Sequence, residues 1–288
     1  MRLGVVILPD MRWGDAREKW RRAEDLGFDH AWTYDHVVWD GLADSPWFGS
    51  VPTLAAAAIV SERIRLGTLV ASPNFRHPVP FARELMTLDD ISNGRITLGL
   101  GAGSKGSDST LVEPGKVRPA DRAERFAEFV GLLDGLLRGD DAAFDGHHYS
   151  VNRPGLRPGS VQSPRIPFAV AAANHRSMNV VARHAQLWIT NGDRGHQGPP
   201  LPPADGAGVV SRQMELLDHA CRRQGRDPAT IDRLVLTGSR LDSGLRSAAS
   251  FAELREIYEA VGVTDLVVHW PREDEPHAGD ESILEQIV

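Results

Sequence analysis

The run LMTLDDISNGRITLGLGAG, residues 85–103, contains the repeating pattern that decides the fold. Its first half continues a stripe of apolar side chains at helical spacing, which begins at Phe81 and ends at Ile91. Its second half contains Ile96–Leu100, a short apolar run of the length typical of a buried strand. The run therefore predicts a helix that leads directly into a strand.

The same alternation extends from this run toward both ends of the chain. We expect strands at Leu3–Leu8, Phe28–Tyr34, Ile64–Val70, Ile96–Leu100, Ile166–Ala171, Leu187–Thr190, Leu234–Gly238 and Leu266–His269. Helical stripes separate them in one repeated order, which favours a closed (β/α)8 TIM barrel over an open sheet. We therefore expect residues 1–288 to form a single α/β domain.

Three irregular stretches interrupt this alternation. Gly103–Pro119 follows the fourth strand and Asn191–Gly206 follows the sixth, so both are extended βα loops. Such loops lie at the C-terminal face of a barrel, where functional sites are built. The third stretch, Asp140–Pro164, precedes the fifth strand, and its segment FDGHHYSV predicts a short hairpin with a structural role.

Composition excludes several classes of function. The net charge of −7 is spread along the chain, which argues against a nucleic-acid groove or a polybasic membrane patch. Apolar runs are too short for a membrane span, and the N-terminal sequence does not resemble a signal peptide, so we expect a cytoplasmic protein. A single cysteine, Cys221, excludes an internal disulfide framework. The pair His147-His148 has no metal-ligand partner in its flanks, so we expect no metal site.

Five segments, taken in order, resemble the bacterial luciferase-like monooxygenases and their relatives that use flavin mononucleotide (FMN) or the deazaflavin F420. They are AEDLGFDHAWTYDH (23–36), RIRLGTLVASPNFRHP (63–78), LMTLDDISNGRITLGLGAG (85–103), RIPFAVAAANHRSMNVVARHAQLWITNG (165–192) and CRRQGRDPATI (221–231). The resemblance covers nearly the whole chain. It implies an oxidoreductase that holds a tricyclic ring in the barrel mouth, acts on a small-molecule substrate and forms a homodimer.

The resemblance implies catalytic roles for two residues at the end of the second strand. Asp35 would lie near the polar edge of the ring and contribute to cofactor binding, and His36 would exchange a proton beside the reacting centre. An imidazole suits this task because its ordinary pKa near 6.5 gives access to both protonation states. The residues alone leave an alternative open, in which Asp35 caps the next segment and His36 lies in a solvated loop.

The resemblance also implies a set of cofactor-binding residues. By position, Leu69 and Val70 would carry a non-prolyl cis peptide bond behind the ring, although an ordinary strand end is the alternative. Backbone N–H groups at the start of a helix near His175 would bind the cofactor phosphate. The implied contacts are Leu69, Val70, Gly103, Ser104, Ser107, Ala171, Ala172, Asn174, Thr190 and Asn191.

The chain also departs from many relatives. Ser104-Lys105-Gly106-Ser107 occupies the place of a Trp or Glu after the glycine run, so we expect substrate chemistry different from that of the best-known members. The Asp35-His36 pair and the later Gly67-Thr68-Leu69-Val70 segment resemble those of F420 users, so the resemblance implies F420 rather than FMN. The alternatives are an FMN-dependent monooxygenase and a non-catalytic flavin- or F420-binding protein. A metal-dependent barrel hydrolase is disfavoured because strands three to five end in Val70, Leu100 and Ala171.

Overall fold

A computed structural model describes residues 1–103, 106–112, 118–141, 143–152 and 155–288. Within these ranges, eight parallel strands close into a barrel in the order β1-β10-β9-β8-β7-β4-β3-β2. The strands are β1 (Arg2–Val6), β2 (His30–Thr33), β3 (Arg65–Thr68), β4 (Ile96–Leu100), β7 (Phe168–Ala171), β8 (Leu187–Thr190), β9 (Asp232–Leu236) and β10 (Asp265–His269). The expected TIM barrel is therefore confirmed.

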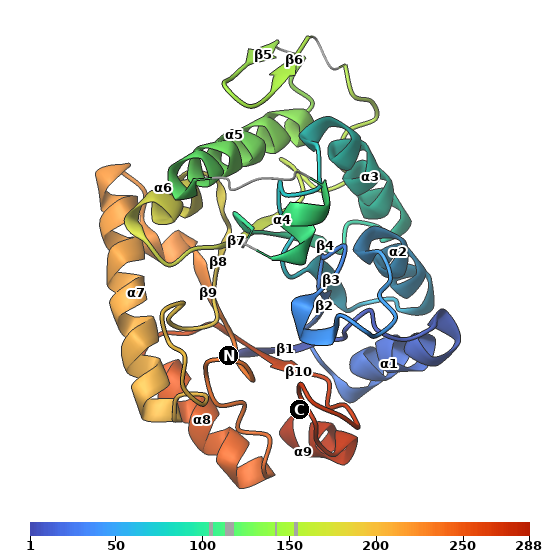
Figure 1. The fold of residues 1–288 in the computed structure, drawn as a ribbon, viewed down its shortest axis with the longest axis vertical. Coiled ribbons are helices and arrows are strands. Elements are labelled where there is room, and N and C mark those ends of the chain that lie inside the picture. The colour runs from blue at the N-terminus through green and yellow to red at the C-terminus, as the bar shows by residue number, and fades with distance from the viewer. Residues whose placement is uncertain (104–105, 113–117, 142, 153–154) are drawn as a thin grey trace.

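Helices form an outer ring around this barrel (Figure 1). They are α1 (Trp13–Leu26), α2 (Ser50–Val60), α3 (Pro78–Ile91), α5 (Pro119–Arg138), α6 (His175–His184), α7 (Pro203–Arg223), α8 (Ala248–Ala260) and α9 (Leu284–Ile287), with 3-10 turns at Asp40–Leu42, Pro228–Thr230 and Glu281–Ile283. The short helix α4 (Ser107–Val112) lies inside this ring, over the barrel mouth (Figure 1). The stripe on α3 packs against the barrel through Phe81, Leu85 and Leu88. Ile91 is 42% exposed because the helix ends there.

Several strands are shorter than expected at the edge where the site lies. The strands β2 and β3 stop at Thr33 and Thr68, so the residues that follow are free to leave the sheet. At the end of β9, Gly238 has a φ of 88°, which an extended strand does not accommodate. The barrel therefore opens into irregular backbone at its C-terminal face.

The connections contain one expected and one unexpected feature. The short hairpin is present as an antiparallel pair, β5 (Phe144–Asp145) and β6 (Ser150–Val151), beyond α5 in Figure 1. The loop after β4 contains the helix α4, which the sequence analysis did not anticipate. No helix among the described residues is long and apolar enough to cross a bilayer.

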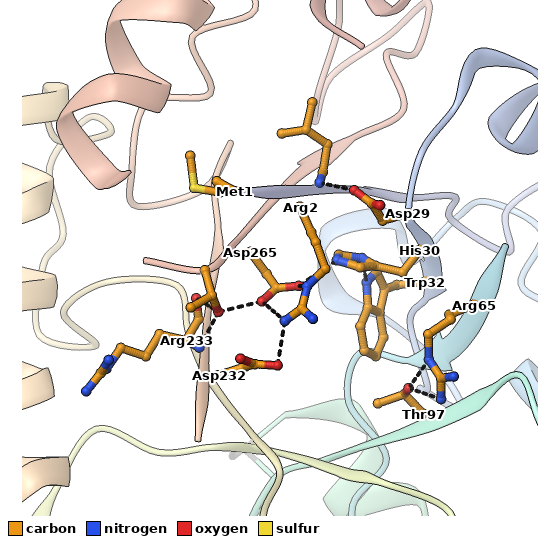
Figure 2. Close-up of polar contacts among 12 residues, drawn as sticks. Met1, Arg2, Asp29, His30, Trp32, Arg65, Thr97, Asp232, Arg233 and Asp265 are labelled. Atoms are coloured by element: carbon orange, nitrogen blue, oxygen red, sulfur yellow. Dashed lines mark hydrogen bonds and ion pairs between the residues drawn. The ribbon is translucent and has the colours of Figure 1, made fainter. Parts of the chain in front are cut away.

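A polar network occupies the opposite, N-terminal end of the barrel (Figure 2). The guanidinium of Arg2 contacts both carboxylate oxygens of Asp265 at 2.7 Å, and His30 Nε2 lies 3.0 Å from the same carboxylate. The indole of Trp32 donates to His30 Nδ1 at 2.7 Å, which leaves Nε2 to donate to Asp265. Burial would raise the pKa of Asp265, but His30 and Arg2 outweigh it and lower this pKa to about 2.

Candidate active site

A cavity of about 450 Å³ lies among the C-terminal ends of the strands. This volume lies within the range of roughly 300–1,000 Å³ found for small-molecule sites. Most of the residues implied by the resemblance line this one cavity, namely Asp35, His36, Leu69, Val70, Gly103, Ala171, Ala172, Asn174, Thr190 and Asn191. Ser104 lies outside the described residues. Ser107 is not among the lining residues, because α4 turns its hydroxyl toward the carboxylate of Asp40.

His36 is held at the cavity wall by a carboxylate that the sequence analysis missed. Its Nδ1 lies 2.5 Å from Oδ2 of Asp108, which belongs to α4. Oδ1 of Asp108 accepts the N–H groups of Val37 at 2.7 Å and of Val38 at 3.0 Å. Asp108 therefore fixes both the ring and the backbone that follows it.

The protonation of Asp108 decides the tautomer of His36. Burial by itself would raise the pKa of Asp108, but the hydrogen bonds from His36 and from the backbone of Val38 and Val37 hold it below the ordinary value. The carboxylate is therefore ionised near neutral pH and acts only as an acceptor, so Nδ1 of His36 carries a proton. In the neutral ring Nε2 is then the acceptor, and no hydrogen bond to it is found among the described residues.

Asp35 lines the cavity but is engaged by other side chains. Arg76 contacts it through two hydrogen bonds of 2.7 Å, and the hydroxyl of Ser50 donates to Oδ1 at 2.6 Å. Burial would lower the pKa of Arg76, but Asp35 outweighs it and raises this pKa. Asp35 is 3% exposed, so its structural contribution is to anchor the segment that carries His36.

The wall formed by β3 and β4 brings main chain close to the cavity. The peptide bond between Leu69 and Val70 is cis, as the resemblance implied. A Cβ atom at Gly101 would lie 2.5 Å from Cγ2 of Val70, so glycine is required for this approach. Gly103 has a φ of 74°, and a Cβ there would lie 2.5 Å from the side chain of Asn74. Both glycines therefore keep side chains out of this part of the cavity wall.

The start of α6 is capped by its own side chains. The side chain of Asn174 accepts the N–H groups of Arg176 and Ser177, each at 3.1 Å. The hydroxyl of Ser177 accepts the N–H groups of Ala173 and Asn174, each at 3.3 Å. A capping box therefore satisfies these four N–H groups, because asparagine at the N-cap supplies its own acceptor. The phosphate contact expected at this helix start stays a prediction.

Ala172 and Thr190, two further residues that the resemblance implies as cofactor contacts, form hydrogen bonds within the protein. The N–H group of Ala172 donates to the carbonyl of Ile189 at 3.2 Å, which continues the link between β7 and β8. The hydroxyl of Thr190 donates to Oε1 of Gln213 at 2.5 Å and accepts the N–H group of Gly192 at 3.1 Å. These contacts rigidify the wall at the end of β8, and an anionic ligand requires other donors.

Besides Arg176 at the start of α6, three arginines that the sequence pattern does not indicate supply such donors. Arg122 from α5, Arg194 from the loop after β8 and Arg240 from the segment after β9 all line the cavity. Partial burial, followed by repulsion from Arg122 and Arg240, lowers the pKa of Arg194. No carboxylate partner for any of the three is found in the described part of the chain. The arginines converge from elements far apart in the sequence, so no local motif indicates them.

Tyr34 is a further cavity residue that the pattern did not indicate. Its hydroxyl lies 2.8 Å from Nε2 of His269, the last residue of β10. Burial raises the pKa of Tyr34, while burial and then repulsion from His277 lower the pKa of His269 well below its ordinary value. Both groups are therefore neutral near neutral pH, and this contact fixes the phenol ring at the cavity wall.

Comparison with known proteins shows what this chain is similar to. An F420-dependent glucose-6-phosphate dehydrogenase from Beutenbergia cavernae is 31% identical over 211 residues, which cover 68% of this chain and 58% of that protein. The aligned part of this chain thus spans about three fifths of that relative's length.

Two solved structures share the fold over 99% of this chain and 96% of their own. They are a coenzyme F420-dependent tetrahydromethanopterin reductase from Methanopyrus kandleri, with a TM-score of 0.78 and 19% identity, and an F420-dependent secondary alcohol dehydrogenase in complex with an F420–acetone adduct, with a TM-score of 0.80 and 15% identity. The family model described as luciferase-like monooxygenase matches residues 1–239. Because this match extends over most of the barrel, the chain belongs to the luciferase-like monooxygenase family.

Proposed function

We propose that this protein is an F420-dependent oxidoreductase that transfers a hydride to or from a small organic substrate in the barrel mouth. One observation carries the proposal: a histidine with a fixed tautomer and three arginines without carboxylate partners, among the described residues, line the same cavity. The names of the relatives support F420 in particular, since the dehydrogenase and both solved structures are described as F420-dependent or F420-bound.

The residues present fit such a cofactor. The backbone at Leu69–Val70, together with Gly101 and Gly103, forms a wall where main chain can face a planar ring. Arg122, Arg194 and Arg240 would hold the phosphate-bearing tail, because guanidinium groups bind phosphate with several donors at once. When bound, F420 supplies a ring carbon that accepts or releases a hydride.

The chain's own side chains would manage the proton that accompanies the hydride. During oxidation of an alcohol, Nε2 of His36 would accept the hydroxyl proton, and Asp108 would stabilise the resulting imidazolium through Nδ1. During reduction the same nitrogen would return the proton. The Asp35–Arg76 pair would keep this segment in place, so Asp35 acts as a positioning residue rather than as a second proton carrier.

The test is a pair of binding titrations followed by turnover. Purified protein is titrated with F420 and with FMN, and binding is followed by fluorescence quenching. We expect saturable binding of F420 and much weaker binding of FMN. Micromolar binding of FMN with no binding of F420 would overturn the proposal in favour of a flavin-dependent monooxygenase.

A His36→Gln variant separates catalysis from binding. It should bind F420 as the parent protein does and lose most turnover of a panel of secondary alcohols, aldehydes and sugar phosphates. Binding of F420 without turnover of any substrate in the parent protein would instead favour a non-catalytic cofactor-binding protein.

A homodimer in the cytoplasm belongs to the same proposal, supported by membership of this family. Sedimentation equilibrium should then give a mass of about twice the 31.5 kDa of the chain.

A further inference from the structure

A second group of ligand-type side chains meets between α5 and the turn of the β5–β6 hairpin. We propose that Glu124, His147 and His148 form a binding site for a divalent transition metal ion such as Zn²⁺. The proposal is independent of the F420 assignment, since none of the three residues lines the barrel-mouth cavity.

The distances already approach those of a metal site. Nδ1 of His147 lies 3.6 Å from Oε1 of Glu124, and Nε2 of His148 lies 3.9 Å from Oε2 of the same residue. One ligand atom from each residue lies within 4.8 Å of the other two. Ligands bound tetrahedrally at about 2.0–2.1 Å are roughly 3.3–3.4 Å apart. Small rotations of these side chains, two of which are exposed, would complete the coordination.

The backbone of the hairpin turn is held in place without any metal. Glu128, one helical turn after Glu124 on α5, accepts the N–H groups of His147 at 2.9 Å, His148 at 2.8 Å and Tyr149 at 3.3 Å. A Cβ atom at Gly146 would lie 2.4 Å from Oε2 of Glu128, so glycine permits this close approach. The turn is therefore fixed against α5 in a way that aims both imidazoles at Glu124.

One buried nitrogen of this group has no hydrogen-bond partner among the described residues. Nε2 of His148 is shielded from solvent and has no hydrogen-bond partner in the part of the chain that the structure describes. A buried polar atom in this condition is unfavourable, and a coordinated ion would satisfy it. Two imidazole nitrogens and one carboxylate suit Zn²⁺, Ni²⁺ or Cu²⁺ better than Mg²⁺ or Ca²⁺, which prefer oxygen ligands.

The residues that flank His147-His148 offer no further metal ligand, so the local sequence predicts no metal site there. The carboxylate comes instead from α5, which precedes the hairpin in the chain. A metal ion here would join the hairpin to the helix that also carries Arg122 and Ala123 at the barrel mouth.

The test is calorimetric titration of untagged, chelator-treated protein with ZnCl₂. We expect about one ion per chain, with affinity falling roughly tenfold or more in each of Glu124→Gln, His147→Ala and His148→Ala. The matched control is His219→Ala, which removes an exposed imidazole on α7 and should leave binding unchanged. Circular dichroism checks that each variant is folded.

A second readout is the absorption spectrum of the Co²⁺-loaded protein. Ligand-field bands in the visible region should be present in the parent protein and in His219→Ala, and absent from His148→Ala. The proposal is overturned if no ion binds stoichiometrically, or if Glu124→Gln and His148→Ala bind Zn²⁺ as the parent protein does.

Discussion

Nδ1 of His36 lies 2.5 Å from Oδ2 of Asp108, although 72 positions separate the two residues in the chain. The sequence analysis noted that the glycine run lacks the Trp or Glu that many relatives carry just after it. Asp108 comes from the same loop and brings a carboxylate to His36 by way of the short helix α4. His36, the proton carrier that we propose, therefore has an acidic partner at the barrel mouth.

Asp108→Asn tests whether this carboxylate sets the tautomer of His36. The amide oxygen can still accept the N–H groups of Val37 and Val38, so the fold should be retained. The amide nitrogen would face Nδ1 and favour the opposite tautomer, so we expect kcat to fall roughly 10²-fold with little change in the Kd for F420. Steady-state kinetics and a binding titration measure the two quantities. Asp25→Asn, at an exposed position on α1, is the control, and an unchanged kcat in Asp108→Asn would contradict the prediction.

Arg194→Gln and Arg240→Gln test the anion-binding side of the cavity. Each variant should raise the Kd for F420 roughly tenfold, about 1.4 kcal/mol, because a charged donor to the tail is lost. Fluorescence titration measures the Kd. Arg212→Gln removes an exposed arginine of α7 and should have no effect. An unchanged Kd with a higher KM for the organic substrate would show that these arginines bind the substrate instead.

Arg76→Met tests the buried ion pair beneath His36. Removing the guanidinium leaves the 3% exposed carboxylate of Asp35 without its bidentate partner, so the free energy of unfolding should fall by about 3 kcal/mol. Urea denaturation measures this change. Glu84→Gln removes the half-exposed second partner of the same arginine and should cost less than about 1 kcal/mol. Equal effects of the two substitutions would refute the assignment.

The lowered pKa of Asp265 makes the free energy of unfolding depend on pH in the acid range. Burial would raise the pKa of its carboxyl, but His30 and Arg2 lower it to about 2, against an ordinary value of 3.8. A carboxyl whose pKa is lower in the folded protein than in the unfolded chain stabilises the fold at pH values above its unfolded-state pKa. The contribution of Asp265 is therefore complete above about pH 4. It is lost as the pH falls toward about 2, and the difference corresponds to about 2 kcal/mol.

Asp265→Asn should therefore lower the free energy of unfolding by about 2 kcal/mol at pH 7 and flatten the loss of stability between about pH 4 and pH 2. Denaturation at a series of pH values measures both effects. Asp232→Asn, which removes the half-exposed carboxylate on the same arginine, should cost less than about 1 kcal/mol and keep the acid slope. If the free energy of unfolding of Asp265→Asn still fell as steeply between about pH 4 and pH 2, other carboxyl groups would be responsible for the acid dependence.

The barrel could be predicted from local pattern, whereas much of the cavity lining was implied by the resemblance to the luciferase-like family. Alternating strand and helix periods, as in residues 85–103, require neighbouring elements to bury their apolar sides together, and a βα repeat closes into a barrel. The ends of its parallel strands then meet at one face, which places Asp35, His36, Leu69 and Val70 around one cavity. Each of these residues follows the last residue of β2 or β3 within three positions, so a barrel of this order places it at the C-terminal face.

Tertiary structure alone decided which side chains act on one another. Three contacts join separate elements, and no periodicity in the sequence encodes them. They are the contacts of Asp108 with His36, of Arg76 with Asp35 and of Glu124 with His148. Periodicity records which face of an element is buried, whereas hydrogen bonds depend on the positions of atoms to within tenths of an ångström. Those positions are set only when the helices have packed around the closed barrel.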